Sequence, residues 1–173
     1  MAKKILSKEL AKQEPEELLR LLDELSRRFP VARMYLNMEF GLEAESIVEK
    51  YRKALQKEYF PSRGRGRARI SRSDKILKEF GMISAFSEDL LEMNWFQVEL
   101  AIRYHLHYMY EYEPFMKGLL RNWRTTVQLA KETGSLPEYL KKLETIFPGE
   151  FRTYYLHRLL KDIADELPEA EED

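Results

Sequence analysis

The chain has 173 residues, and its 29 lysines and arginines nearly balance its 30 aspartates and glutamates, which leaves a formal net charge of -1. Apolar residues make up 44% of the sequence, so the composition is unlike that of a disordered chain and suits one folded domain of ordinary size. The absence of cysteine excludes disulfides and thiolate chemistry.

Neither a membrane span nor a signal peptide is expected from the sequence. No apolar stretch approaches the ~20 residues that a membrane span requires. The basic start, MAKKILSKEL, is not followed by an uninterrupted apolar region. A chain without cysteine needs no oxidising compartment, so we expect a cytoplasmic protein. We expect no membrane contact.

Apolar residues recur at helical spacing along the whole chain, and no run alternates apolar and polar residues long enough to indicate a strand. In the first half, the expected helices cover about residues 7–12, 15–29, 31–40, 43–59 and 74–80. In the second half they cover about 87–112, 115–133 and 150–167, and another starts at the apparent capping box SLPE, residues 135–138. The longest helix carries the apolar stripe Leu91, Trp95, Val98, Ile102, Leu106 and Met109.

Short turns between consecutive helices predict an all-α fold, either an irregular array or a bundle of antiparallel helical hairpins. We expect a single helical domain over residues 1–167 with a basic loop at 61–73 inside it. The acidic end of the chain, residues 168–173, is expected to be a disordered tail.

Several stretches together resemble a bacterial family known as domain of unknown function 6155. They are SKELAKQEPEELLRLLDEL, FPVARMYLNMEF, KALQKEYFP before the basic loop, and RISRSDKILKEFG before the long helix. The likeness covers about residues 5–145. It implies a helical bacterial protein with no assigned activity, and it supplies no catalytic residue.

Catalytic and metal-binding patterns are scarce. His105 and His107 are two residues apart, which directs them to different sides of a helix, so they cannot share a metal ion. His105 is expected to be a hydrogen-bonded core residue and His107 a solvent-facing one. Glu92 and Glu99 are roughly aligned on the long helix, where surface ion pairs such as Glu99 with Arg103 are the simpler interpretation. We expect no catalytic residue, metal site or cofactor.

The most distinctive stretch is FPSRGRGRARISRSDK, residues 60–75, which holds five arginines within ten positions. No acidic residue lies between Glu58 and Asp74. We predict that residues 62–72 are irregular, flexible and dispensable for the fold, because two alternate glycines weaken helix formation and few apolar residues could anchor them. Ser71 and Ser73 are candidate caps of the next helix, whose N-terminus would favour an anion.

A second basic stripe recurs at helical spacing after Pro114, where packing could bring it beside the loop. The predicted anion-binding residues are Arg63, Arg65, Arg67, Arg69, Arg72, Lys75, Lys117, Arg121 and Arg124. Arginine's planar fork suits phosphate or carboxylate oxygens. Our leading hypothesis is therefore a non-enzymatic adaptor that binds nucleic acid or an acidic protein through the arginine segment.

Other interpretations stay open. The loop could carry ordinary solubilising charge, or it could be held by the chain's own acidic tail. The protein could instead be an interaction module with an apolar groove, for which Trp95, Tyr104, Tyr108 and Trp123 are the first aromatic candidates. An enzyme acting on a phosphorylated substrate is a third possibility. The oligomeric state does not follow from the sequence.

Overall fold

The computed structural model describes residues 2–84, 86–147, 149 and 155–167. Within these residues every regular element is an α-helix, so the predicted all-α fold of antiparallel packed helices is confirmed. The helices are α1 (Ala2–Leu10), α2 (Pro15–Arg28), α3 (Pro30–Glu39), α4 (Ala44–Tyr59), α5 (Ile70–Gly81), α6 (Ser87–Tyr108), α7 (Glu113–Glu132), α8 (Leu136–Ile146) and α9 (Tyr155–Glu166). None of the described helices combines the length and the apolar character that a membrane span needs.

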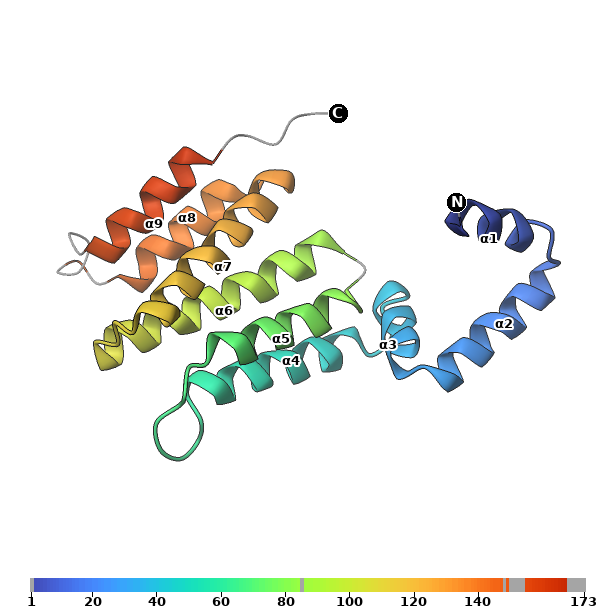
Figure 1. Ribbon diagram of the computed structural model, residues 1–173, viewed down its shortest axis with the longest axis horizontal. Helices are drawn as coiled ribbons and strands as arrows, with labels where there is room; N and C mark the ends of the chain where they lie inside the picture. Colours follow the sequence, from blue (N-terminus) through green and yellow to red (C-terminus); the bar gives the residue numbers. More distant parts are fainter. Residues whose placement is uncertain (1, 85, 148, 150–154, 168–173) are drawn as a thin grey trace.

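Helix α6 lies at the centre of the body and contacts α4, α5, α7 and α8 (Figure 1). Its buried residues face several directions at once, which is why Val98, Ala101 and Ile102 are all inaccessible to solvent. Trp95 packs edge-on against Trp123 of α7 at 6.0 Å between ring centroids. A helix that is apolar on most sides is stable only when other helices surround it, and α6 meets that requirement.

Three predicted helices have wrong boundaries. The first helix covers Ala2–Leu10 rather than about 7–12. Helix α6 ends at Tyr108 rather than near residue 112, because Met109 adopts a left-handed conformation with φ of 47° and is 56% exposed instead of continuing the apolar stripe. Helix α5 begins at Ile70, so the last part of the predicted basic loop is already helical. The predicted start of the last helix at 150 and the acidic tail at 168–173 lie outside the described residues.

The serines that the sequence suggested as caps do not cap. The N-cap of α5 is Arg69, and that of α8 is Ser135, but neither side chain bonds to a backbone amide of its helix. Ser135 instead shares a 2.6 Å hydrogen bond with Thr133. Ser73 lies inside the body and bonds to Tyr59.

Residues 2–42 form an N-terminal arm that leaves the body at α3 (Figure 1). Helix α2 contacts α3, and α3 contacts the start of α4. Met38 is the one buried apolar side chain that we find in the described part of the arm. The arm and the α4–α5 loop therefore lie at opposite ends of α4.

Candidate anion-binding site

The loop between α4 and α5, residues 60–69, is called the arginine loop below. Its backbone is held against the end of α4. The amide of Ala68 donates a 3.0 Å hydrogen bond to the carbonyl oxygen of Glu58, and the Ala68 side chain is buried. Gly66 approaches the same turn so closely that a Cβ atom there would lie 2.0 Å from the carbonyl oxygen of Tyr59. Residues 62–69 are therefore irregular, as predicted, but backbone contacts and the buried Ala68 side chain hold the loop against α4.

Arg65 occupies a cage of three tyrosines at the end of α6. Its guanidinium carbon lies 4.4 Å from the ring centroid of Tyr108, and 5.5 and 5.3 Å from those of Tyr104 and Tyr110. Its Nε donates a 2.9 Å hydrogen bond to the Tyr104 hydroxyl, which itself donates to the carbonyl oxygen of Gly66 at 2.8 Å. Because the faces of aromatic rings attract cations, this cage holds the loop against the body.

Arg69 is fixed by Glu58. Its Nε and Nη2 donate to the two carboxylate oxygens at 2.9 and 3.1 Å, and its backbone amide donates to Oε1 at 3.0 Å. Burial alone would raise the pKa of Glu58, but these hydrogen bonds and the charges of Arg69 and Arg72 outweigh it and lower that pKa. The carboxylate nearest the loop is thus ionised and already occupied by one arginine.

A hollow of about 380 Å³, called the α4 hollow, lies between the arginine loop, α4 and α5. It is lined by Ala54, Lys57, Glu58, Pro61, Arg65, Gly66, Arg67, Arg69, Arg72 and Ile76. Five of these side chains are cationic, and the one carboxylate among them, on Glu58, is bound by Arg69. The α4 hollow therefore has an excess of positive charge.

A second hollow of about 380 Å³, called the α7 hollow, shares Arg67 and Arg69 with the first and extends to α7. It is lined by Arg67, Ala68, Arg69, Ile70, Ser71, Asp74, Tyr110, Tyr112, Pro114, Phe115 and Arg121. The first turn of α5 lies in this wall. Its N-cap residue, Arg69, makes no side-chain cap, and the Glu58 carboxylate accepts the hydrogen bond of the Arg69 amide. Tyr112 is 59% exposed beside these arginines.

The predicted stripe on α7 meets the loop at one residue. Arg121 donates to Asp74 of α5 at 2.5 Å and lines the α7 hollow. Lys117 pairs instead with Glu113, and Lys75 pairs with Glu79. Neither they nor Arg124 lines either hollow, so the structure brings together only part of the predicted set.

The exposed arginines differ in whether other groups of the protein already contact them. Arg65 and Arg69 have the contacts described above, whereas no described acidic side chain pairs with Arg63, Arg67 or Arg72. Arg67 and Arg72 line the hollows, and Arg63 lies in the exposed part of the loop. The cations that remain available to a partner are therefore fewer than the sequence suggested. The acidic tail, which could also have neutralised them, lies outside the described residues.

A buried polar chain behind the α7 hollow was not predicted. The Tyr59 hydroxyl accepts a 2.6 Å hydrogen bond from Gln97, whose side-chain oxygen accepts one of 3.0 Å from Asn122, and Asn122 also donates to Asp74 at 3.2 Å. Burial raises the pKa of Tyr59 to about 12, so its hydroxyl stays protonated. Gln97 and Asn122 inside apolar helix faces were the available signal, because buried amides require partners.

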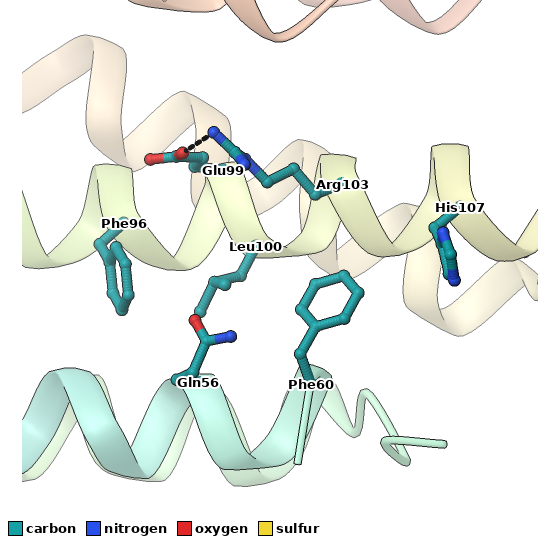
Figure 2. A pocket seen from close by; sticks show the side chains of 7 residues that line it. All are labelled: Gln56, Phe60, Phe96, Glu99, Leu100, Arg103 and His107. Carbon is teal, nitrogen blue, oxygen red and sulfur yellow. Dashed lines mark ion pairs between the residues drawn. The ribbon is translucent and has the colours of Figure 1, made fainter. Parts of the chain in front are cut away.

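A larger hollow of about 570 Å³ lies between α4 and α6. Figure 2 shows Phe96 and Leu100 pointing from α6 toward α4, while Glu99 and Arg103 pair with each other at 2.7 Å. Phe60 closes the end of this hollow nearest the arginine loop. The expected ion pair is confirmed, and it leaves Glu99 neutralised by its own helix.

The aromatic candidates for an exposed groove are mostly core residues. Trp95, Tyr104 and Trp123 are at most 5% exposed, and Tyr108 is half-buried against Arg65. His105 is buried and its Nδ1 lies 2.9 Å from the carbonyl oxygen of Tyr110, which confirms the predicted core histidine. His107 is exposed on α6, as expected. No cluster of three or more potential metal ligands occurs in the described part of the chain.

The fold and this site define the class of protein: it is all-α and has a basic surface at one end of a helical hairpin. The model of the family described as "Family of unknown function (DUF6155)" matches residues 1–165, and the chain belongs to that family. No curated protein and no solved structure matches the chain.

Proposed function

We propose that this protein binds nucleic acid through the arginine loop and the two hollows beside it, as an adaptor rather than as an enzyme. The observation that carries this proposal is the α4 hollow, where five cationic side chains surround a single carboxylate that Arg69 already occupies. A phosphate group entering this hollow meets cations without having to displace an acidic residue of the protein. The arginine fork matches its oxygens.

One feature favours single-stranded nucleic acid over an acidic protein. Tyr112 is exposed on the α7 hollow next to Arg67 and Arg69, and exposed aromatic rings beside positive charge stack unpaired bases. The sequence has no base-reading motif, so the contacts are to phosphate and to ring faces and do not select a sequence. Because the loop is already anchored to the body, binding costs little conformational entropy.

The test measures binding of a labelled single-stranded oligonucleotide by fluorescence anisotropy at several salt concentrations. Three available arginines predict a slope of about -2 for the logarithm of the affinity against the logarithm of the salt concentration. The double substitution Arg67→Ser with Arg72→Ser should weaken binding at low salt about tenfold or more, while the far-ultraviolet circular dichroism stays unchanged.

The matched control is Lys141→Ser with Arg158→Ser. It removes the same charge from α8 and α9, which lie on the other side of the body from the loop (Figure 1). The control should retain most of the affinity. No binding at low salt, or equal losses in both double variants, would overturn the proposal. Tighter binding of polyglutamate than of the oligonucleotide would assign the surface to an acidic protein instead.

A further inference from the structure

Exposed apolar side chains are concentrated in the N-terminal arm. Of the sixteen large apolar side chains that are exposed in the described structure, eleven lie between Ile5 and Leu42. They are Ile5, Leu6, Leu19, Leu21, Leu22, Leu25, Phe29, Val31, Tyr35, Phe40 and Leu42. Single exposed apolar residues need no explanation, but a concentration of this kind indicates a surface that another molecule covers.

Helix α2 is the clearest case because it contains no buried residue. At about 100° per residue, its five leucines fall within an arc of about 160°, and its charged residues occupy the rest of the helix surface. Helix α3 contacts α2 but leaves Leu19, Leu22 and Leu25 at 66%, 43% and 37% exposed. A helix of this length is marginal in water without a partner for its apolar face.

The charges beside the leucines indicate which partner fits. Two acidic residues precede Leu22 by five and six positions, Glu17 and Glu16. Two basic residues follow it by the same distances, Arg27 and Arg28. Glu17 and Arg28 flank one edge of the apolar face, whereas Glu16 and Arg27 lie on the polar side of the helix. The helix is therefore acidic at its start, basic at its end, and symmetric about Leu22.

This symmetry suits a second α2 running in the opposite direction. In an antiparallel pair centred on Leu22, the same edges of the two helices meet, so that Glu17 of each copy faces Arg28 of the other. Leu18 of each then packs beside Leu25 of the other. A parallel pair would place like charges together at both ends, which costs free energy.

We propose that two copies of this chain associate through an antiparallel, two-fold contact between their α2 helices. Such a contact is self-complementary, as a closed dimer requires. Arg27 and Arg28 already pair with Asp23 and Glu24 one turn back, at 2.7 and 2.5 Å. These pairs are exposed and contribute little by themselves, so they do not prevent the arginines from reaching the partner's carboxylates.

The first test is the mass of the full chain in solution, by light scattering coupled to size-exclusion chromatography at about 100 µM, a concentration suited to a micromolar dimer. We expect twice the monomer mass of 20.7 kDa. Leu22→Asp should shift the protein to monomer. The control Met82→Asp places the same charge on a similarly exposed apolar residue after α5 and should leave the dimer intact.

The second test determines the direction of the helices. Glu17→Arg and Arg28→Glu should each weaken the dimer, and the double variant should restore it. Each substitution also places the wrong charge at a helix end, so an effect of helix stability alone would make the double variant the weakest of all. A monomeric wild type, or a double variant weaker than either single one, would overturn the proposal. A fully dimeric Leu22→Asp variant would also overturn it.

Discussion

Gly66 determines how closely the arginine loop lies against the body. Its missing side chain lets the loop backbone pass the last carbonyl groups of α4, where a Cβ atom would lie 2.0 and 2.4 Å from the carbonyl oxygen and carbon of Tyr59. Backbone atoms cannot rotate away as a flexible side chain can. Any larger residue therefore has to displace the loop, and with it Arg65 from the tyrosine cage.

We predict that Gly66→Ala lowers the free energy of unfolding by about 1–3 kcal/mol, the usual cost of overpacking. Urea denaturation followed by circular dichroism measures this. The matched control is Gly149→Ala, where a Cβ would meet nothing within 4 Å, and its effect should stay within about 0.5 kcal/mol. Equal effects of the two substitutions would show that the close contact does not matter for stability.

Sequence reasoning found the arginines but not their separate roles. Alternating arginine and glycine indicated mobile positive charge, whereas Arg65 and Arg69 have structural contacts and Gly66 is required by packing. The cage around Arg65 depends on tyrosines about 40 positions further along the chain. Local spacing cannot report a contact that arises only when α4 packs on α6.

At the scale of helices, Glu92 of α6 joins α4 to α8. Its carboxylate accepts hydrogen bonds from Arg52 of α4 at 3.2 Å, and from Tyr139 and Lys142 of α8 at 2.9 and 3.0 Å. Burial alone would raise the pKa of Glu92, but the hydrogen bonds from Lys142 and Tyr139, with the charges of Lys142 and Arg52, lower it below the ordinary 4.5. Three helices therefore share one ionised group.

Because the pKa of Glu92 is lower in the folded than in the unfolded chain, its contribution to stability is present above the ordinary pKa of 4.5 and is lost as the pH falls through the folded value. We predict that Glu92→Gln lowers the free energy of unfolding at pH 7 by about 1 kcal/mol, a modest figure because the side chain is 45% exposed. The difference from wild type should shrink as the pH falls below 4.5.

Urea denaturation at several pH values measures this prediction. Asp162→Asn on α9 serves as control, since that carboxylate is exposed and no described residue bonds to it. It should change stability little at any pH in this range. A Glu92→Gln variant that is as stable as wild type at pH 7 would contradict the prediction.

The helices themselves were predictable, and their ends were less so. Periodic apolar residues identified the long helices because burial on one face leaves a repeat in the sequence. The end of α6 at Tyr108 was missed because Met109 turns the chain in a left-handed conformation that the sequence does not mark with glycine or asparagine. The start of α5 was missed because Arg69, not a serine, precedes the first turn.

For the whole molecule, stability is expected to reside in residues 44–167. Nearly all the buried apolar side chains of the described structure lie there, and α2 contributes none. We predict that removal of residues 1–28 leaves a cooperatively unfolding protein whose melting temperature in dilute solution changes by only a few degrees. Differential scanning calorimetry measures this, and loss of the cooperative transition would show that the arm supports the body.

The fold class followed from the sequence, but the separation of arm and body did not. The leucines of α2 have the same spacing as those of a helix that packs into a core. Periodicity reports that a face is apolar and does not report which molecule covers it. That α2 has no buried residue follows from the tertiary structure, in which the other helices pack around α6 and not against the leucines of α2.

The position of the arm at the far end of α4 from the arginine loop has a consequence for long ligands. Two copies joined through their α2 helices would keep both arginine loops uncovered on one particle. If, as proposed, a long nucleic acid occupied the first loop, the second would meet it at a local concentration in the millimolar range, set by the geometry of the pair. The pair would then bind long strands more tightly than short ones, although each individual loop would contact the same few phosphates.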